Sequence, residues 1–288
     1  MPYLYLLITA LASTAVNVLG KVFHKKNTSG YDGTPIYTFL LLGSAFVCWS
    51  ATFAFDFSFD SGVLLYSLLF ALFFTAGHVG IVGAMQCGPA TLTSLFIGLS
   101  LLIPTVWGFF FWNAEFTVLV GMGLLLVAIS IFLCLYTQQK SETSFSPRWF
   151  FFIALATLGN AGCTIVQKQQ QMNFNGEHGT MLMFFALLFS LPLYFLVYLK
   201  SERKGDAVIL KEAWWIPALA GISNTLLNLF VILLASSELS PNLIYPVIGV
   251  GSLAAVTVFS LFVFKERMRW WQWVGVGIGA VAVALLSL

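Results

Sequence analysis

Ten long apolar runs, separated by short polar loops, occupy most of the 288 residues and limit what this chain can fold into. A helix needs about 20 apolar residues to cross the hydrocarbon core of a bilayer. The runs cover residues 3–20, 35–54, 62–84, 90–112, 116–136, 149–166, 180–199, 214–234, 242–264 and 270–288. Each run is continuously apolar, whereas the strands of a membrane barrel alternate and span only about ten residues. The sequence therefore predicts an all-α integral membrane protein with about ten transmembrane helices.

Composition and charge argue against a soluble domain or a nucleic-acid-binding module. Only 8% of the residues are charged, against roughly 25% in soluble domains. The longest polar connections, 137–147 and 200–212, are too short to form a separate domain. A net charge of +2 without a concentrated basic patch does not indicate a nucleic-acid partner. Because the cysteines lack metal-site or disulfide spacing, we expect packing residues and neither a metal nor a cofactor; they are Cys48, Cys87, Cys134 and Cys163.

The chain also carries signs of an internal repeat. Three sets of matches follow one another in the same order, at a shift that grows slowly from about 143 residues. They pair Thr14 and Asn17 with Thr157 and Asn160, Ser100 with Ser252, and Gly121-x-Gly123 with Gly275-x-Gly277. We predict two five-helix repeats within one membrane domain, residues 1–140 and 147–288. Because five is odd, the second copy is inverted in the membrane, and a substrate site is expected between the copies near the midplane.

The basic residues predict an orientation. Twelve of the 13 Lys and Arg residues fall in the loops after the odd-numbered runs, and Lys168 is the exception. Cytoplasmic loops carry an excess of Lys and Arg. This bias predicts a multi-pass protein of the cell membrane, inner or plasma, with both termini outside.

Several motifs resemble the EamA-type branch of the drug/metabolite transporter superfamily. In the first half, Gly88–Pro89–Ala90 leads into a run with Pro104 that ends near Glu115, and a glycine-rich run follows. In the second half, the counterpart extends from Leu239–Ser240–Pro241 through Lys265–Glu266–Arg267 to Gln272–Trp273–Val274–Gly275. The resemblance implies ten helices, inverted repeats, a central cavity, and transport of amino acids, related metabolites, sugars, nucleotides or organic cations. It also implies cytoplasmic termini, in conflict with the charge bias, and we follow the charge bias.

Candidate substrate-binding residues are polar or aromatic groups at membrane depth. Small drug exporters of the superfamily carry a carboxylate in the first helix, but this sequence has Thr14 and Asn17 there, which argues against proton-coupled drug export. All acidic residues fall in loops or at helix ends. His78 could bind solute or relay a proton, or it could be a neutral imidazole bonded to a neighbouring helix.

Amides and aromatic rings complete the predicted site. Asn17 and Asn160 are matched in the repeats, whereas Asn224 and Asn228 lie four residues apart and so share one helix face. Amides in a membrane can hold a solute or join helices. Tyr245 and Trp107 can supply aromatic walls. The substrate-binding residues we predict are Thr14, Asn17, His78, Trp107, Asn160, Asn224, Asn228 and Tyr245.

Two further segments receive structural interpretations. The polar run 167–171 is predicted to close the sixth helix. Together with the segment to His178 it could form a solute vestibule, but we favour a solvated loop. The Gly-x-Gly elements follow no strand, so they are interpreted as close-packing helix faces, a role that also fits a homodimer contact.

We therefore expect a secondary transporter, without enzymatic activity, that moves a small polar metabolite by alternating access. An amino acid or a related neutral or zwitterionic solute is the first expectation, and nucleosides, sugars or organic cations are the alternative. The rival class is a membrane-embedded lipid-modifying enzyme, for which His24 with Lys25 and Asp32, or Glu177 with His178, are the available groups.

Overall fold

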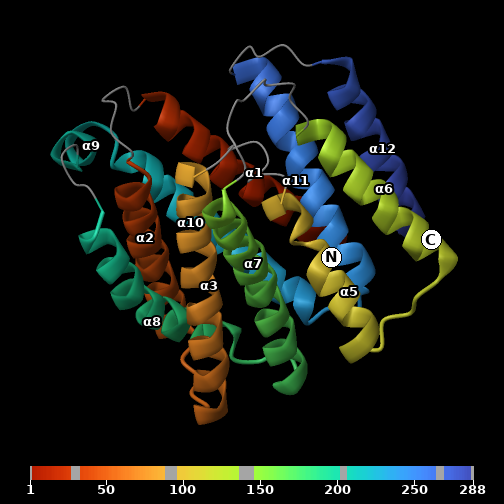
Figure 1. Ribbon diagram of the computed structural model, residues 1–288. Coiled ribbons are helices and arrows are strands. Elements are labelled where there is room, and N and C mark those ends of the chain that lie inside the picture. Colours follow the sequence, from red (N-terminus) through yellow and green to blue (C-terminus); the bar gives the residue numbers. More distant parts are fainter. Residues whose placement is uncertain are drawn as a thin grey trace.

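Helices account for nearly all of the structure (Figure 1). The computed structural model describes residues 2–26, 33–87, 96–135, 146–201, 206–263 and 269–286, and no strand occurs among them. The helices are α1 (Pro2–Lys26), α2 (Thr34–Phe55), α3 (Ser61–Cys87), α5 (Leu102–Phe111), α6 (Val118–Leu135), α7 (Pro147–Asn173), α8 (Gly179–Leu199), α9 (Asp206–Glu212), α10 (Trp215–Ala235), α11 (Pro241–Val263) and α12 (Trp270–Leu286). The predicted all-α fold class is confirmed.

Most helices begin and end within a few residues of the predicted runs, and the differences have local causes. α1 continues to Lys26 and α7 to Asn173, because both helices run on through polar residues after the apolar stretch ends. The fourth run is interrupted: residues 96–99 are helical, a turn follows at Ser100 and Leu101, and α5 then begins. Pro104 has no N–H to donate to the carbonyl of Ser100. That carbonyl instead accepts from the N–H of Ile103 at 3.1 Å, in the tighter pattern of a turn.

Six helices are long and apolar enough to cross a membrane: α1, α2, α3, α7, α8 and α10. Three shorter apolar helices cover Phe96–Phe111, Val118–Leu133 and Trp270–Leu286. Large apolar side chains lie on the outside of the bundle, among them Phe55, Phe110 and Val118, which are 94%, 76% and 78% exposed. An apolar outer surface of this kind suits lipid rather than water. The protein is a multi-pass membrane protein.

Glycines set the distance between several helices. α3 packs along α7, and α6 packs along α12 (Figure 1). A Cβ added to Gly80 of α3 would lie 2.3 Å from the backbone nitrogen of Ala156 in α7, and one added to Gly159 would lie 2.4 Å from the nitrogen of Gly77. Small residues allow this close backbone approach. Gly123, in one of the predicted Gly-x-Gly elements, faces α12 in the same way: a Cβ added to it would lie 2.7 Å from Cγ of Leu286.

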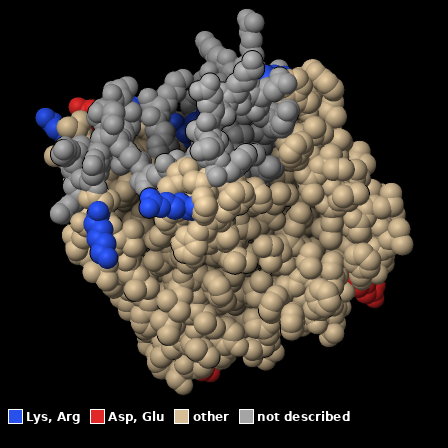
Figure 2. Space-filling view, viewed as in Figure 1, with Lys and Arg blue, Asp and Glu red and all other residues tan. Residues whose placement is uncertain are grey.

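The two ends of the bundle differ in charge. Figure 2 shows Lys and Arg side chains mainly at one end of the molecule, with some acidic surface beside them, and further acidic side chains at the opposite end. The end where α1 finishes, called here the basic end, holds Lys21, Lys26, Arg148, Lys200, Lys211 and Arg269, together with Asp206 and Glu212. The opposite end, called here the acidic end, holds Asp56, Asp60, Glu115, Glu177 and Glu238 in the loops between helices. Both α1 and α12 have their chain-terminal ends at the acidic end, as Figure 1 shows.

Candidate functional site

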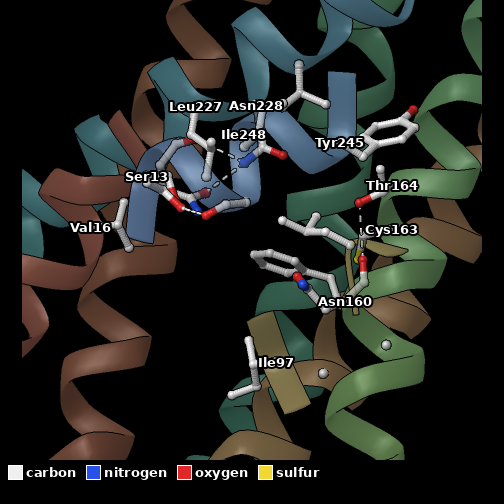
Figure 3. A pocket seen from close by; sticks show the side chains of 18 of the residues that line it. Ser13, Val16, Ile97, Asn160, Cys163, Thr164, Leu227, Asn228, Tyr245 and Ile248 are labelled. Atoms are coloured by element: carbon white, nitrogen blue, oxygen red, sulfur yellow. Dashed lines mark hydrogen bonds between the residues drawn. The ribbon is translucent and has the colours of Figure 1, made fainter. Parts of the chain in front are cut away.

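A cavity of about 560 Å³ lies between helices of both halves of the chain (Figure 3). α1, α3, α7, α10 and α11 supply most of its lining, and residues of the interrupted fourth run and α6 complete it. In Figure 3, Asn160, Cys163 and Thr164 of α7 lie on one side, and Ser13 and Val16 of α1 lie on the other. Among the described residues that line it, none is Asp, Glu, Lys or Arg. Its volume is in the range of small-molecule sites.

Six of the eight predicted site residues line this cavity. They come from five different helices that are far apart in the sequence: Asn17 of α1, His78 of α3, Asn160 of α7, Asn224 and Asn228 of α10, and Tyr245 of α11. The fold therefore brings them together at one place. Their part in binding a solute stays a prediction.

Thr14 and Trp107 do not line the cavity. The Thr14 side chain is buried, and its hydroxyl donates to the carbonyl of Ala10 at 2.7 Å and to that of Ser252 at 3.4 Å, so it joins α1 to α11. Trp107 lies in a shallow apolar groove on the outside of α5 and stacks on Phe111 with ring centroids 4.1 Å apart. Mid-run position in the sequence does not reveal which face of a helix a residue occupies, and in α5 that face is the outer one.

Gln167 is a cavity residue that the sequence interpretation missed. The predicted solvated loop over 167–171 is wrong, because α7 continues to Asn173 and most of this run is buried. Gln167 is 2% exposed, and its Nε2 donates to Oδ1 of Asn228 at 2.9 Å and to Sδ of Met183 at 3.5 Å. The signal was available in the sequence: Asn160, Thr164 and Gln167 are spaced four and three apart and so share one helix face.

The amides of α7 and α10 form a connected chain. Nδ2 of Asn228 donates to the backbone carbonyl of Asn224 at 2.9 Å and to its Oδ1 at 3.1 Å, while Oδ1 of Asn228 accepts from Gln167. Such bonds are worth about 1 kcal/mol each in a membrane interior. The chain holds three amide side chains in fixed positions at the cavity wall.

Asn160 is fixed by the interrupted helix. The hydroxyl of Ser100 donates to the carbonyl of Ile97 at 2.6 Å, and its oxygen accepts from Nδ2 of Asn160 at 2.6 Å. Asn17, the repeat counterpart of Asn160, instead donates to the carbonyl of Ser13 on its own helix at 3.0 Å. The two matched amides are therefore held differently.

His78 is bonded within its own helix. Its Nδ1 lies 3.0 Å from the carbonyl of Phe74, and because a carbonyl only accepts, Nδ1 carries the proton. The ring also packs against Phe74 with centroids 4.4 Å apart. From the sequence, a hydrogen-bonded imidazole is the alternative to solute binding for His78. Such a bond is present, but its acceptor lies on α3 itself and not on a neighbouring helix.

The groups considered for an enzyme are not assembled into a cluster in the described part of the chain. Asp32 and the side chains of His24 and Lys25 lie outside the described residues. Glu177 and His178 lie at the acidic end, with Oε2 and Nε2 3.9 Å apart, and His178 also bonds to Ser58. No group of three His, Cys, Asp or Glu residues that could hold a metal is found among the described residues.

Comparisons with known proteins agree with this architecture. Residues 147–288 match the EamA-like transporter family. A solved structure, described only as the crystal structure of a protein, has a TM-score of 0.78 at 13% sequence identity and covers 99% of this chain and 95% of that chain. At this identity the likeness establishes the fold alone. No curated protein matches the sequence.

Proposed function

The chain belongs, through residues 147–288, to the EamA-like transporter family, and we propose on this premise that it is a secondary transporter of a small polar metabolite. The observation that carries the proposal is the cavity between the two halves, lined by amides from α1, α7 and α10. A site at the interface of two halves is where alternating access operates, because rocking one half against the other exposes the site to each side in turn.

The helix contacts support two inverted repeats, residues 1–140 and 147–288. Exchanging α1, α2, α3, α5 and α6 with α7, α8, α10, α11 and α12, in that order, turns most of the larger helix contacts into contacts that are also present; the exceptions include α11–α12, α6–α11 and α7–α10, whose counterparts have few or no contacts among the described residues. The α3–α7 contact becomes α1–α10, α2–α10 becomes α3–α8, and α1–α11 becomes α5–α7, while α2–α8, α5–α11 and α6–α12 map onto themselves. This is the pattern expected of a pseudo-two-fold axis through the cavity.

The lining favours a neutral or zwitterionic solute such as an amino acid. Amides and hydroxyls bind polar groups without the cost of a buried unpaired charge, and the phenyl rings of Phe70, Phe73 and Phe74 cover apolar portions. Nucleosides, sugars and organic cations are the second candidates, since the same amides and rings suit them.

The charge of the two ends supports a cell-membrane protein with the basic end in the cytoplasm. Lys and Arg mark the cytoplasmic side of membrane proteins. Since α1 begins and α12 ends at the acidic end, both termini are then outside. A cysteine introduced at Glu238 in a cysteine-free background should react with an impermeant thiol reagent added to whole cells, and protection there would reverse the orientation.

Flux into proteoliposomes tests the transport proposal. The purified full chain is reconstituted, and uptake of a panel of labelled amino acids, nucleosides, sugars and amines is measured. We expect saturable uptake of at least one solute and a loss of about tenfold or more in Asn228→Leu, because that change removes the centre of the amide chain. Gln169→Leu is the matched control on α7, since Gln169 does not line the cavity. Absence of flux for every solute would overturn the proposal.

A further inference from the structure

The hydrogen bonds inside the cavity leave an excess of acceptors. Each polar side chain in the lining can be examined for the hydrogens and lone pairs that its protein partners already use. Where a partner is a carbonyl oxygen, it can only accept, so the side-chain atom facing it must be the donor. The orientation of most amides in the cavity is therefore fixed by chemistry.

Gln167 and Asn228 have no hydrogen left for a solute. Asn228 directs Nδ2 to the backbone carbonyl of Asn224, which fixes its Oδ1 as the acceptor of the bond from Gln167. Nε2 of Gln167 uses its hydrogens on Asn228 and on Sδ of Met183. Oε1 of Gln167 remains, with no partner among the described residues.

Three more lining groups are used as donors by the protein. Nδ1 of His78 donates to Phe74, so Nε2 of the neutral ring accepts. The hydroxyl of Thr164 donates to the carbonyl of Asn160 at 3.3 Å, and that of Ser252 donates to the carbonyl of Gly249 at 3.0 Å. Each of these side chains, like Gln167 and Asn228, has only lone pairs to offer.

No lining side chain is limited to donating. Asn17 and Asn160 each keep one free N–H and Asn224 keeps two, but each of these side chains also keeps a carbonyl lone pair. The hydroxyl of Ser13 can do either. Tyr245 has a hydroxyl without a partner among the described residues, but that oxygen is buried. Lys, Arg and Trp, the side chains that only donate, do not occur among the lining residues that the structure describes.

We infer that the cavity binds its solute through a protonated primary amino group. An ammonium carries three donors, no acceptor and a positive charge, so it complements a cluster of oxygen and nitrogen lone pairs. The π faces of phenylalanines such as Phe73 and Phe74 add favourable electrostatics for a cation. This inference rests on the proposed transport function and names the chemical class of its solute.

The acidic end supports the same charge preference. Asp56, Asp60, Glu115, Glu177 and Glu238 surround this end, and the one basic residue of that part of α7, Lys168, is buried with its ammonium bonded to the carbonyl of Ala235. Carboxylates at this end of the bundle raise the local concentration of cations on that side of the membrane and lower that of anions. An amine on this side would be concentrated before it binds.

A matched set of four-carbon probes separates hydrogen bonding from charge. Binding of n-butylammonium, N,N,N-trimethylbutylammonium, 1-butanol and butyrate to the full chain in nanodiscs is measured by saturation-transfer NMR at constant ionic strength. We expect n-butylammonium to bind at least about fivefold more tightly than the trimethyl cation, which keeps the charge but has no donor. Equal affinity of the two cations, or tighter binding of butanol or butyrate, would overturn the inference.

A charge placed in the cavity gives a second test with a defined sign. Asn160→Asp is nearly isosteric, and the Ser100 hydroxyl can turn its hydrogen toward the new carboxylate. We expect n-butylammonium to bind about tenfold more tightly, while Gln169→Glu, which adds a carboxylate on the same helix outside the cavity, should strengthen binding by less than about twofold. Weaker binding in Asn160→Asp would contradict the inference. If that variant does not fold, Gln167→Leu, which removes a free acceptor, should weaken n-butylammonium at least threefold, and unchanged affinity would contradict it.

The flux panel keeps the two claims distinguishable. Saturable uptake of a solute without an amino group, and of no amine, would leave the transport proposal standing and remove the amine preference. Selective n-butylammonium binding without flux of any solute would support the amine preference and overturn the transport proposal.

Discussion

The two helix seams α3–α7 and α1–α10 occupy equivalent places in the proposed repeats, but they are built in different ways. Along α3–α7, the backbones meet at Gly80 and Gly159, where a Cβ would lie under 3 Å from a backbone atom of the other helix, and Gly159 faces the backbone of Gly77. Along α1–α10 the contact includes side chains such as Tyr5 and Phe230, whose ring centroids are 5.4 Å apart. Where two helices touch through their backbones, as in the glycine seam α3–α7, there are no side chains between them that can rearrange. Where they touch through side chains, as in the side-chain seam α1–α10, such rearrangement is possible. We therefore expect α3–α7 to move as one body and α1–α10 to yield when the halves rock.

The same contrast extends to the polar residues of α7 and α1. Asn160 bonds across to Ser100 of the interrupted fourth run, whereas Asn17 bonds back to its own helix. Beyond Asn160, α7 buries a polar turn that includes Gln167 and Lys168. If the two halves are repeats, as proposed, they share a scaffold, and we expect individual substitutions to make one copy of the seam more rigid than the other.

A bulky residue at the glycine seam should have the largest effect. In Gly159→Val, the new Cβ would lie 2.4 Å from the backbone nitrogen of Gly77. We therefore expect the free energy of unfolding to fall by more than about 3 kcal/mol, or the protein to fail to fold. Thermal unfolding in detergent measures it. Gly43→Ala is the control, because nothing lies within 4 Å of a Cβ there. A stable Gly159→Val protein with normal flux would show that the α3–α7 seam is not rigid.

Loss of the buried lysine should have the next largest effect. Lys168 is 8% exposed, and its ammonium bonds to the carbonyl of Ala235 at the C-terminus of α10. Lys168→Ala removes a charge-assisted bond and leaves space, so we expect destabilisation of about 2 kcal/mol. Lys26→Ala at the exposed end of α1 should cost less than about 0.5 kcal/mol. Equal unfolding midpoints for the two variants would refute a structural role for the buried polar turn.

The matched asparagines should differ by a smaller amount. Asn160→Ala breaks an inter-helix bond to Ser100, so we expect a loss of about 1 kcal/mol, while Asn17→Ala breaks only a bond within α1 and should change stability by less than about half of that. Chemical unfolding in mixed micelles compares them. Equal losses would mean that the two copies of the seam are held alike.

Apolar length predicted most of the fold because a membrane leaves the backbone few alternatives to helix. The runs located the helices, and Pro104 lies in the run that is interrupted. What the sequence could not give is which face each residue occupies. Trp107 and Asn160 are both mid-run, but one lies on the outer surface and the other lines the cavity. Rotation of a helix depends on its neighbours, and a helix that is apolar all round carries no stripe to fix it.

The polar end of α7 shows a second limit. Gln167 and its neighbours look like a loop by composition, because polar residues in a row are usually solvated. Their burial depends on partners from other helices: Asn228, Ala235 and the chain around Glu177. Such partners lie about 60 residues away in the first two cases, so composition along one segment cannot reveal them.

The side-chain seam should tolerate substitution better than the glycine seam. Tyr5→Leu keeps an apolar side chain of moderate size between α1 and α10 and loses mainly the ring contact with Phe230. We expect destabilisation of about 0.5 to 1 kcal/mol, well below that of Gly159→Val, with flux retained within twofold. Uptake into proteoliposomes and thermal unfolding of the same preparation measure both quantities. Because a seam that yields during transport must accept several side-chain arrangements, failure of Tyr5→Leu to fold would place the rigid contact at α1–α10 and reverse the comparison.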